Sequence, residues 1–213
     1  CISDSSDILS GAEEARLIYQ GVTIDQHRED HCLGVDIGGG ITELIIGEAL
    51  ESKLLHSCAM GCVSISERFF PDDTITEKSF DAAILYSGQL LEAIRRRYIT
   101  LGCRTAIGSS GTAKALSNCA KNAGLSDGTL SVDILNQLKQ ELLIAGHLDR
   151  IQWDGLAADR IPTICGGLSV MIAVFDLLHI DNMTYSDAAL REGLLHETQE
   201  RLLSHDNRHA SVK

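Results

Sequence analysis

The stretch VDIGGGITELIIGE, residues 35–48, places three consecutive glycines between two short runs that each predict a β-strand. Cys32–Ile37 enters the glycines and Ile41–Gly47 leaves them, so the chain reverses direction within a few residues. Glycines let several backbone N–H groups converge without obstruction by Cβ atoms, which suits a phosphate oxygen. Because a strand and not a helix follows, the pattern is not a dinucleotide fingerprint. A tight hairpin that merely needs glycine is the alternative that this stretch leaves open.

Two carboxylates flank the glycines. Asp36 ends the first strand-like run, and Glu43 lies in the second, two residues after Ile41 and on the same side of a regular strand. Two acidic side chains beside an anion-binding turn are compatible with the anion only if a cation mediates. A hard divalent ion such as Mg²⁺ is the natural mediator, so the pattern favours a metal-assisted phosphate site.

A second glycine and hydroxyl turn, GSSGT at residues 108–112, lies between a strand-like run and a predicted helix start. The free N–H groups of a helix start, with hydroxyls nearby, suit an anion. A simple capped helix start is the alternative here. Two such turns at strand ends of one sheet favour a shared site over coincidence.

Secondary-structure signals follow the order β-β-β-α-β-α-α-α-β-α after a first helix at residues 11–22. The third strand is predicted at Lys53–Met60, which makes a β-meander the economical start. Helical patterns follow at Phe80–Tyr98, Val132–Leu143 and Leu168–Leu178, then a strand in NMTYSD and a last helix at residues 188–203. This order predicts an α/β layer architecture, a mixed sheet of about five strands flanked by helices.

Charge and composition exclude several classes of function. The 213 residues carry a formal net charge of −12, which argues against the basic face that sequence-independent nucleic-acid binding requires. No apolar run reaches the roughly 18 residues of a membrane span, and ICGGLSVMIAVFDLLHI is interpreted as a buried helix. The seven cysteines lack zinc-ligand spacing and are expected to be reduced thiols of a cytoplasmic protein. We expect neither a membrane nor a specific nucleic acid as partner.

The sequence resembles the exopolyphosphatase / guanosine pentaphosphate phosphohydrolase (Ppx/GppA) family. Five blocks carry the resemblance in the family's order and span nearly the whole chain: LSGAEEARLIYQGV, VDIGGGITELIIGE, MGCVSISERFF, AIGSSGTAKAL and YSDAALREGLLHE. The family belongs to the sugar kinase, Hsc70 and actin superfamily, in which two ribonuclease H-like domains close over a phosphate-bearing cleft. The resemblance implies that residues 31–204 form the second such domain, of the actin-like ATPase fold. Residues 1–30 would be an interdomain segment with a helix, residues 205–213 a loose tail, and the first domain absent.

The resemblance also implies a role for each matching residue. Glu14 matches the catalytic base that activates the attacking water. Asp36 and Glu43 match the acidic residues around a divalent metal, Mg²⁺ or Mn²⁺, and are counted as catalytic with Glu14. The residues expected to cradle phosphate are Gly38, Gly39, Gly40, Thr42, Gly108, Ser109, Ser110 and Gly111.

The implied activity is metal-assisted hydrolysis of a terminal phosphoanhydride by water. Inorganic polyphosphate is the first expected substrate and guanosine pentaphosphate the second. Ile41 stands where the family usually has Ser, and Ala188 where it favours Gly. Loss of the hydroxyl motivates an alternative: a polyphosphate- or nucleotide-binding module with weak turnover or none. A kinase-like relative that uses ATP is disfavoured, because the sequence has no recognisable adenosine-binding segment.

Two expectations concern surfaces. A polyanionic substrate needs concentrated cations, and the candidates are Lys53, Lys114, Arg95–Arg97, Arg160 and Arg191. An apolar face where the absent first domain docks would also favour self-association, as in a homodimer.

Overall fold

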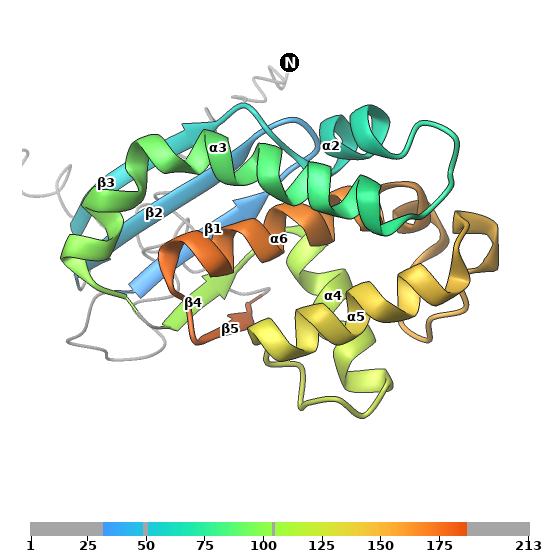
Figure 1. Ribbon diagram of the computed structural model, residues 1–213. Helices are drawn as coiled ribbons and strands as arrows, with labels where there is room; N and C mark the ends of the chain where they lie inside the picture. Colours follow the sequence, from blue (N-terminus) through green and yellow to red (C-terminus); the bar gives the residue numbers. More distant parts are fainter. Residues whose placement is uncertain (1–31, 49–50, 104, 187–213) are drawn as a thin grey trace, which may run out of the picture.

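The computed structural model describes residues 32–48, 51–103 and 105–186 (Figure 1). Several predictions lie outside these ranges: the first helix with Glu14, the last helix with Ala188 and Arg191, and the terminal tail. They stay predictions.

A five-stranded sheet forms the centre of the described part, in the order β3-β2-β1-β4-β5. Its strands are β1 (Cys32–Ile37), β2 (Thr42–Glu48), β3 (Glu51–Cys58), β4 (Thr105–Gly108) and β5 (Asn182–Tyr185). Two antiparallel pairings make the predicted meander of the first three strands. β4 then pairs in parallel with β1, and β5 in parallel with β4, through helical crossovers. The predicted mixed sheet is therefore confirmed.

Helices α3 and α6 lie side by side across one face of the sheet (Figure 1). Part of the predicted stripe of α3, Phe80, Leu91, Ile94 and Tyr98, is buried. The Tyr98 hydroxyl donates to the Leu44 carbonyl of β2 at 2.8 Å, which ties α3 to the sheet. The α-helices are α2 (Cys62–Phe69), α3 (Glu77–Leu101), α4 (Gly111–Asn122), α5 (Val132–Ala145) and α6 (Ile164–Leu178), and the 3₁₀ helices are η1 (Leu148–Arg150) and η2 (Ala158–Thr163).

The side chains of β1 point alternately to the two faces of the sheet, and this separates the core from the functional face. Leu33, Val35 and Ile37 are buried in the main core. Successive side chains of a strand point to opposite faces. Asp36 therefore projects from the face of the sheet opposite to this core.

The apolar helix α6 is buried, as predicted, and it is the central element of the core. The segment Ala158–Leu178 is long and apolar enough to cross a membrane, yet 72% of its most apolar window is buried within the fold. This helix starts at Ile164, earlier than the predicted Leu168. The extra turn contains Gly166, where a Cβ would stand 2.4 Å from the Cys62 carbonyl oxygen. Glycine is thus used here for close helix packing and not as a helix breaker.

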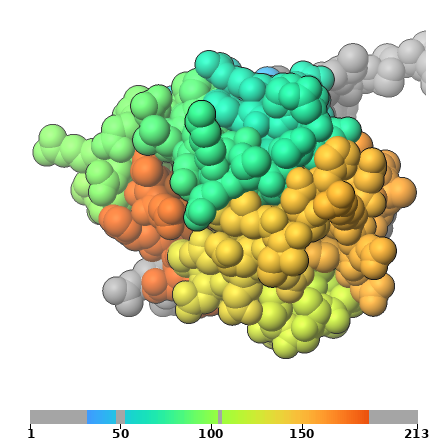
Figure 2. Space-filling model, turned by 45° about the vertical axis from the view of Figure 1, so that its right-hand side comes forward, coloured from blue at the N-terminus to red at the C-terminus, as the bar shows by residue number. Residues whose placement is uncertain are grey.

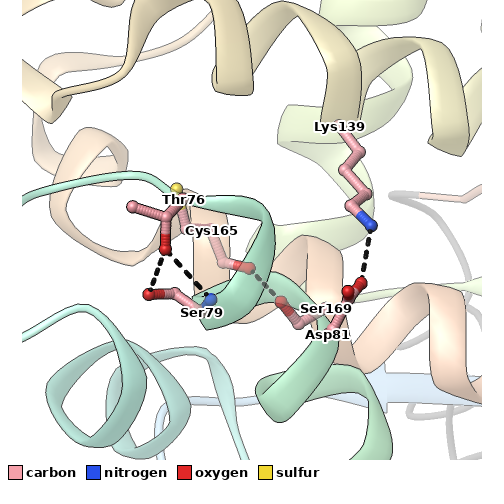
Figure 3. A network of polar contacts seen from close by, with 6 residues as sticks. All are labelled: Thr76, Ser79, Asp81, Lys139, Cys165 and Ser169. Carbon is pink, nitrogen blue, oxygen red and sulfur yellow. Dashed lines mark hydrogen bonds and ion pairs between the residues drawn. The ribbon is translucent and has the colours of Figure 1, made fainter.

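Polar contacts fix the helical layer. In Figure 3, Thr76 caps α3 by accepting the Ser79 N–H at 3.1 Å. Lys139 of α5 forms an ion pair with Asp81 of α3, also at 3.1 Å. Figure 2 shows the teal atoms of α2 and the start of α3 against the yellow and orange atoms of α5 and the segment that follows it. Helix α6 contacts α2, α3 and α5 and so joins them.

Four buried cysteines, Cys58, Cys62, Cys119 and Cys165, are free thiols. Burial raises the pKa of Cys119 to about 11 and that of Cys165 to about 12. Both thiols therefore stay protonated at neutral pH and are poor nucleophiles.

Candidate active site

The two predicted turns lie side by side at the carboxyl ends of β1 and β4. These parallel strands place Val35 opposite Gly108, and the Ser109 N–H donates to the Val35 carbonyl at 3.3 Å. The carboxyl ends of adjacent strands are where open α/β sheets bind ligands. A pocket of about 540 Å³ opens here, lined by both turns, the start of α2 and part of η2.

Asp36 joins the two turns. Its carboxylate accepts a hydrogen bond from the Ser109 hydroxyl at 3.0 Å and lines the pocket. Burial raises the pKa of Asp36 above its ordinary value of 3.8, and the Ser109 hydrogen bond partly opposes that rise. A desolvated carboxylate of this kind is stabilised by a nearby cation.

Glu43 stands directly opposite Asp36 in the antiparallel pair of β1 and β2. Side chains in such a pair project from one face, with Cβ atoms roughly 4.5–5.5 Å apart. Glu43 accepts a hydrogen bond from the Ser57 hydroxyl at 3.3 Å and is not among the described residues that line the pocket. The structure thus brings the two predicted carboxylates together, with Asp36 nearer to the pocket.

The donor set suits a hard divalent cation. Within the described ranges, no group of three or more His, Cys, Asp and Glu side chains is arranged to hold a metal. Mg²⁺ is commonly bound through only one or two carboxylates, with waters and substrate phosphates completing the shell. Asp36 and Glu43 fit that pattern, so the metal site stays a prediction that these residues can satisfy.

The glycine turn leaves only part of its backbone for a ligand. The Gly38 N–H closes the turn by donating to the Ile41 carbonyl at 2.9 Å, so this amide is occupied. This bond places Ile41 in the turn, and β2 begins at Thr42, one residue after the predicted start. The N–H groups of Gly39 and Gly40 have no hydrogen-bond partner among the described residues. Gly39 lines the pocket, and Gly40 follows it in the same turn.

The Thr42 side chain does not join the predicted phosphate cradle. It is fully buried, and its hydroxyl donates to the Met60 carbonyl at 2.8 Å. Its strand partner is Ile37, so it lies on the core face, opposite to Asp36. The resemblance implied a phosphate contact for Thr42 without naming an atom, and sequence gives no sign of this internal partner of the hydroxyl.

The hydroxyls of the second turn are also used within the fold. Ser110 caps α4 by accepting the Ala113 N–H at 3.2 Å, and Ser109 holds Asp36. Thr112 donates to the Ile37 carbonyl at 3.1 Å and fastens α4 to the end of β1. What this turn offers a ligand is the start of α4, where the positive end of the helix dipole faces the pocket.

Arg160 supplies the cation that the pocket needs. It lines the pocket from η2, and its guanidinium lies over Gly111, where a Cβ would stand 2.7 Å from Cζ. Its Nε is 3.7 Å from Asp159 Oδ2, and its side chain is 42% exposed. From the sequence, Arg160 was only one of several candidate cations for a polyanionic substrate. Two others point elsewhere: Lys114 Nζ lies 5.6 Å from the centre of the Tyr185 ring, and Arg95 contacts Glu92.

Comparison with known proteins decides the family. A model of the Ppx/GppA phosphatase family matches residues 5–202. The chain belongs to the Ppx/GppA phosphatase family.

Relatives within the Ppx/GppA family extend beyond this chain. A guanosine-5'-triphosphate,3'-diphosphate pyrophosphatase of Aeromonas salmonicida is 41% identical over 195 residues, covering 92% of this chain and 39% of the relative. The protein of that name from Vibrio cholerae is 40% identical over 207 residues, covering 97% and 41%. The chain therefore spans about two fifths of the length of these relatives.

Solved structures of Ppx/GppA proteins share the fold. An exopolyphosphatase from Cytophaga hutchinsonii superposes with a TM-score of 0.75 at 27% identity, covering 89% of this chain and 64% of that one. An Aquifex aeolicus PPX-GPPA enzyme gives a TM-score of 0.75 at 21% identity, covering 88% and 63%. The fold expected from the resemblance, an actin-like domain with a mixed sheet, is thereby confirmed.

Proposed function

We propose that this Ppx/GppA domain takes part in the hydrolysis of a terminal phosphoanhydride. The observation that carries the proposal is the convergence in one pocket of the Asp36 carboxylate, Gly39 with its unpartnered amide, the start of α4 and Arg160. The unpartnered amide of Gly40 follows in the same turn. Such a set combines hydrogen-bond donors for an anion with a carboxylate that can hold a cation. Positioning and electrostatic stabilisation of this kind are what phosphoryl transfer requires.

Each part has a separate task in the proposed reaction. The amides of Gly39 and Gly40 hold oxygens of the terminal phosphoryl group, and Arg160 binds the charged chain behind it. Asp36 and Glu43 would hold the divalent cation, which would neutralise charge on phosphate oxygens. Attack by water forms a new P–O bond and breaks the bond from phosphorus to the bridging oxygen. The leaving group departs with that oxygen, and Glu14 is proposed to accept the proton of the water.

Guanosine 5'-triphosphate,3'-diphosphate is the substrate that we favour. The relatives at about 40% identity are named as pyrophosphatases of this nucleotide, whereas the structure named as an exopolyphosphatase is 27% identical. This reverses the order expected from the sequence, in which polyphosphate came first. In the proposed reaction the products are orthophosphate and guanosine 5'-diphosphate,3'-diphosphate.

The alternative of a module without turnover has no support in these comparisons, since the relatives and the superposed structure carry the names of hydrolases. The exposed Ile41 side chain belongs to the turn, and its carbonyl holds the turn closed. We retain the proposal that a first domain completes the cleft. The free thiols are consistent with the proposed cytoplasmic location.

The test is release of orthophosphate from guanosine 5'-triphosphate,3'-diphosphate in the presence of Mg²⁺, by the full-length protein. Asp36→Asn keeps the size and an acceptor for Ser109 but removes the charge, and should lower kcat by about 10²–10⁴-fold. Asp133→Asn, at an exposed site at the start of α5, is the matched control and should leave kcat unchanged. Equal rates for wild type and Asp36→Asn would contradict the proposal. Faster release from polyphosphate than from the nucleotide would overturn only the choice of substrate.

A further inference from the structure

The start of α2 holds the glycine turn by its carbonyl groups. The Gly38 carbonyl accepts the Cys62 N–H at 2.8 Å, and the Gly39 carbonyl accepts the N–H groups of Val63 at 2.9 Å and Ser64 at 3.1 Å. These donors belong to the first turn of a helix, where N–H groups have no partner within the helix. The turn and the helix therefore satisfy each other, and Figure 1 shows the β1–β2 turn beside α2.

This contact fixes the direction of the amides that face a ligand. No cis peptide bond occurs among the described residues, and in a trans peptide the C=O and N–H groups point in opposite directions. Because the carbonyls of Gly38 and Gly39 point at α2, the N–H groups of the next residues, Gly39 and Gly40, point away from it. These are the two amides left without a partner among the described residues.

Gly61, which precedes α2, is the residue that permits this approach. A Cβ at Gly61 would stand 2.4 Å from the Gly39 carbonyl oxygen and 2.5 Å from that of Gly38. Its φ of −157° is extended backbone that any residue adopts, so glycine is required here for space and not for conformation. Any side chain at this position would push the turn off the helix.

We infer that Gly61 and the first-turn amides of α2 are positioning elements of the reaction, because they aim the phosphate-binding amides of the glycine turn. Gly61 touches no substrate in this account and acts through the turn. The inference rests on the proposed function, and it adds a residue that lies outside both glycine turns.

The first test compares Gly61→Ala with Gly102→Ala in the full-length protein. Gly102 ends α3 at a φ of 72° with open space around it, so alanine there costs stability through backbone strain alone. Gly61→Ala should lower kcat for the guanosine nucleotide by about 10²-fold, the usual cost of losing one preorganised hydrogen-bond donor to a developing anion. It should also weaken orthophosphate binding by roughly tenfold or more. Gly102→Ala should change neither quantity at temperatures where it is folded.

A second pair of variants covers the case in which Gly61→Ala does not fold. Proline is well accepted at the first position of a helix, and the extended Gly61 suits a following proline. Cys62→Pro removes the N–H that holds the Gly38 carbonyl, whereas Cys62→Ala loses the same thiol and keeps that N–H. We expect kcat of the proline variant to be at least tenfold below that of the alanine variant.

The outcomes separate this inference from the proposed function. Folded Gly61→Ala with kcat and orthophosphate affinity within threefold of wild type overturns the inference and leaves the proposed function intact. The same holds if the two Cys62 variants have equal kcat. A wild-type protein that binds orthophosphate but hydrolyses neither the nucleotide nor polyphosphate overturns the proposed function. The ratio of orthophosphate affinities between wild type and Gly61→Ala then decides whether Gly61 is a positioning residue. Absence of both activity and orthophosphate binding overturns both.

Discussion

In the Gly111→Ala variant, a methyl group would enter the space occupied by the Arg160 guanidinium. The added Cβ would stand 2.7 Å from Cζ, whereas ordinary contacts begin near 3.4 Å, so the guanidinium must retreat by about 0.7 Å. Displacements approaching 1 Å at a binding group cost up to about 10²-fold in rate. We therefore expect kcat/KM for the guanosine nucleotide to fall by roughly 10- to 10²-fold.

The fold itself should tolerate this change. Gly111 is the first residue of α4 and does not have a positive φ. Alanine is favoured over glycine in a helix by about 0.5–1 kcal/mol. The obstacle is the end of a flexible side chain that is 42% exposed. The midpoint of thermal unfolding should therefore stay equal to that of wild type or rise while activity falls.

A double-mutant cycle identifies the cause of the loss. If Gly111→Ala acts by displacing Arg160, its effect should nearly vanish in an Arg160→Ala background, because contacting residues are not additive. Steady-state release of orthophosphate from wild type, both single variants and the double variant supplies the four rates. An equal fold-loss from Gly111→Ala in both backgrounds would refute the argument, since the methyl group would then act on the turn or on the ligand directly.

Three further predictions concern pH and stability. Ser109→Ala removes the hydrogen bond that favours ionised Asp36, so the pKa of Asp36 should rise further. The acid limb of the pH profile of kcat/KM should then move to higher pH. If that limb does not move, Asp36 does not control it. Tyr98→Phe should lower the free energy of unfolding by about 1 kcal/mol in urea titration, because the bond to the Leu44 carbonyl is lost. Ser87→Ala should raise it by about 1 kcal/mol, because the buried Ser87 hydroxyl has no partner among the described residues; a decrease would reveal a partner.

Local periodicity predicted much of the fold because it records which face of an element is buried. The stripe of α3 from Phe80 to Tyr98 was readable in this way. Boundaries were less accurate where tertiary contacts decide them. The third strand was predicted at Lys53–Met60 but is Glu51–Cys58, and the Met60 N–H turns back to the Cys58 carbonyl.

The candidate site was predictable only in part, because tertiary contacts also decide which side chains reach it. Asp36 and Glu43 are adjacent to a turn, so hairpin geometry alone brings them together. Arg160 reaches the pocket because η2 packs against α2 and α6, which no local pattern encodes. The internal bond of the Thr42 hydroxyl could not be foreseen, because its acceptor, Met60, lies beyond β3 in the sequence.

Glycines at helix starts account for how an acidic chain can build an anion site without a basic surface. Gly61 lets the start of α2 reach the glycine turn, and Gly111 lets Arg160 reach the start of α4. Gly166, at the start of α6, allows that helix to contact α2, since a Cβ there would meet the Cys62 carbonyl oxygen at 2.4 Å. At each of these positions glycine has no side chain to keep the neighbouring group away. The positive ends of helix dipoles and free amides can therefore come close together. The net charge of −12 is then no obstacle. The field that binds phosphate comes from nearby oriented peptide groups and one guanidinium, whereas exposed charges more than a Debye length away are largely screened by salt.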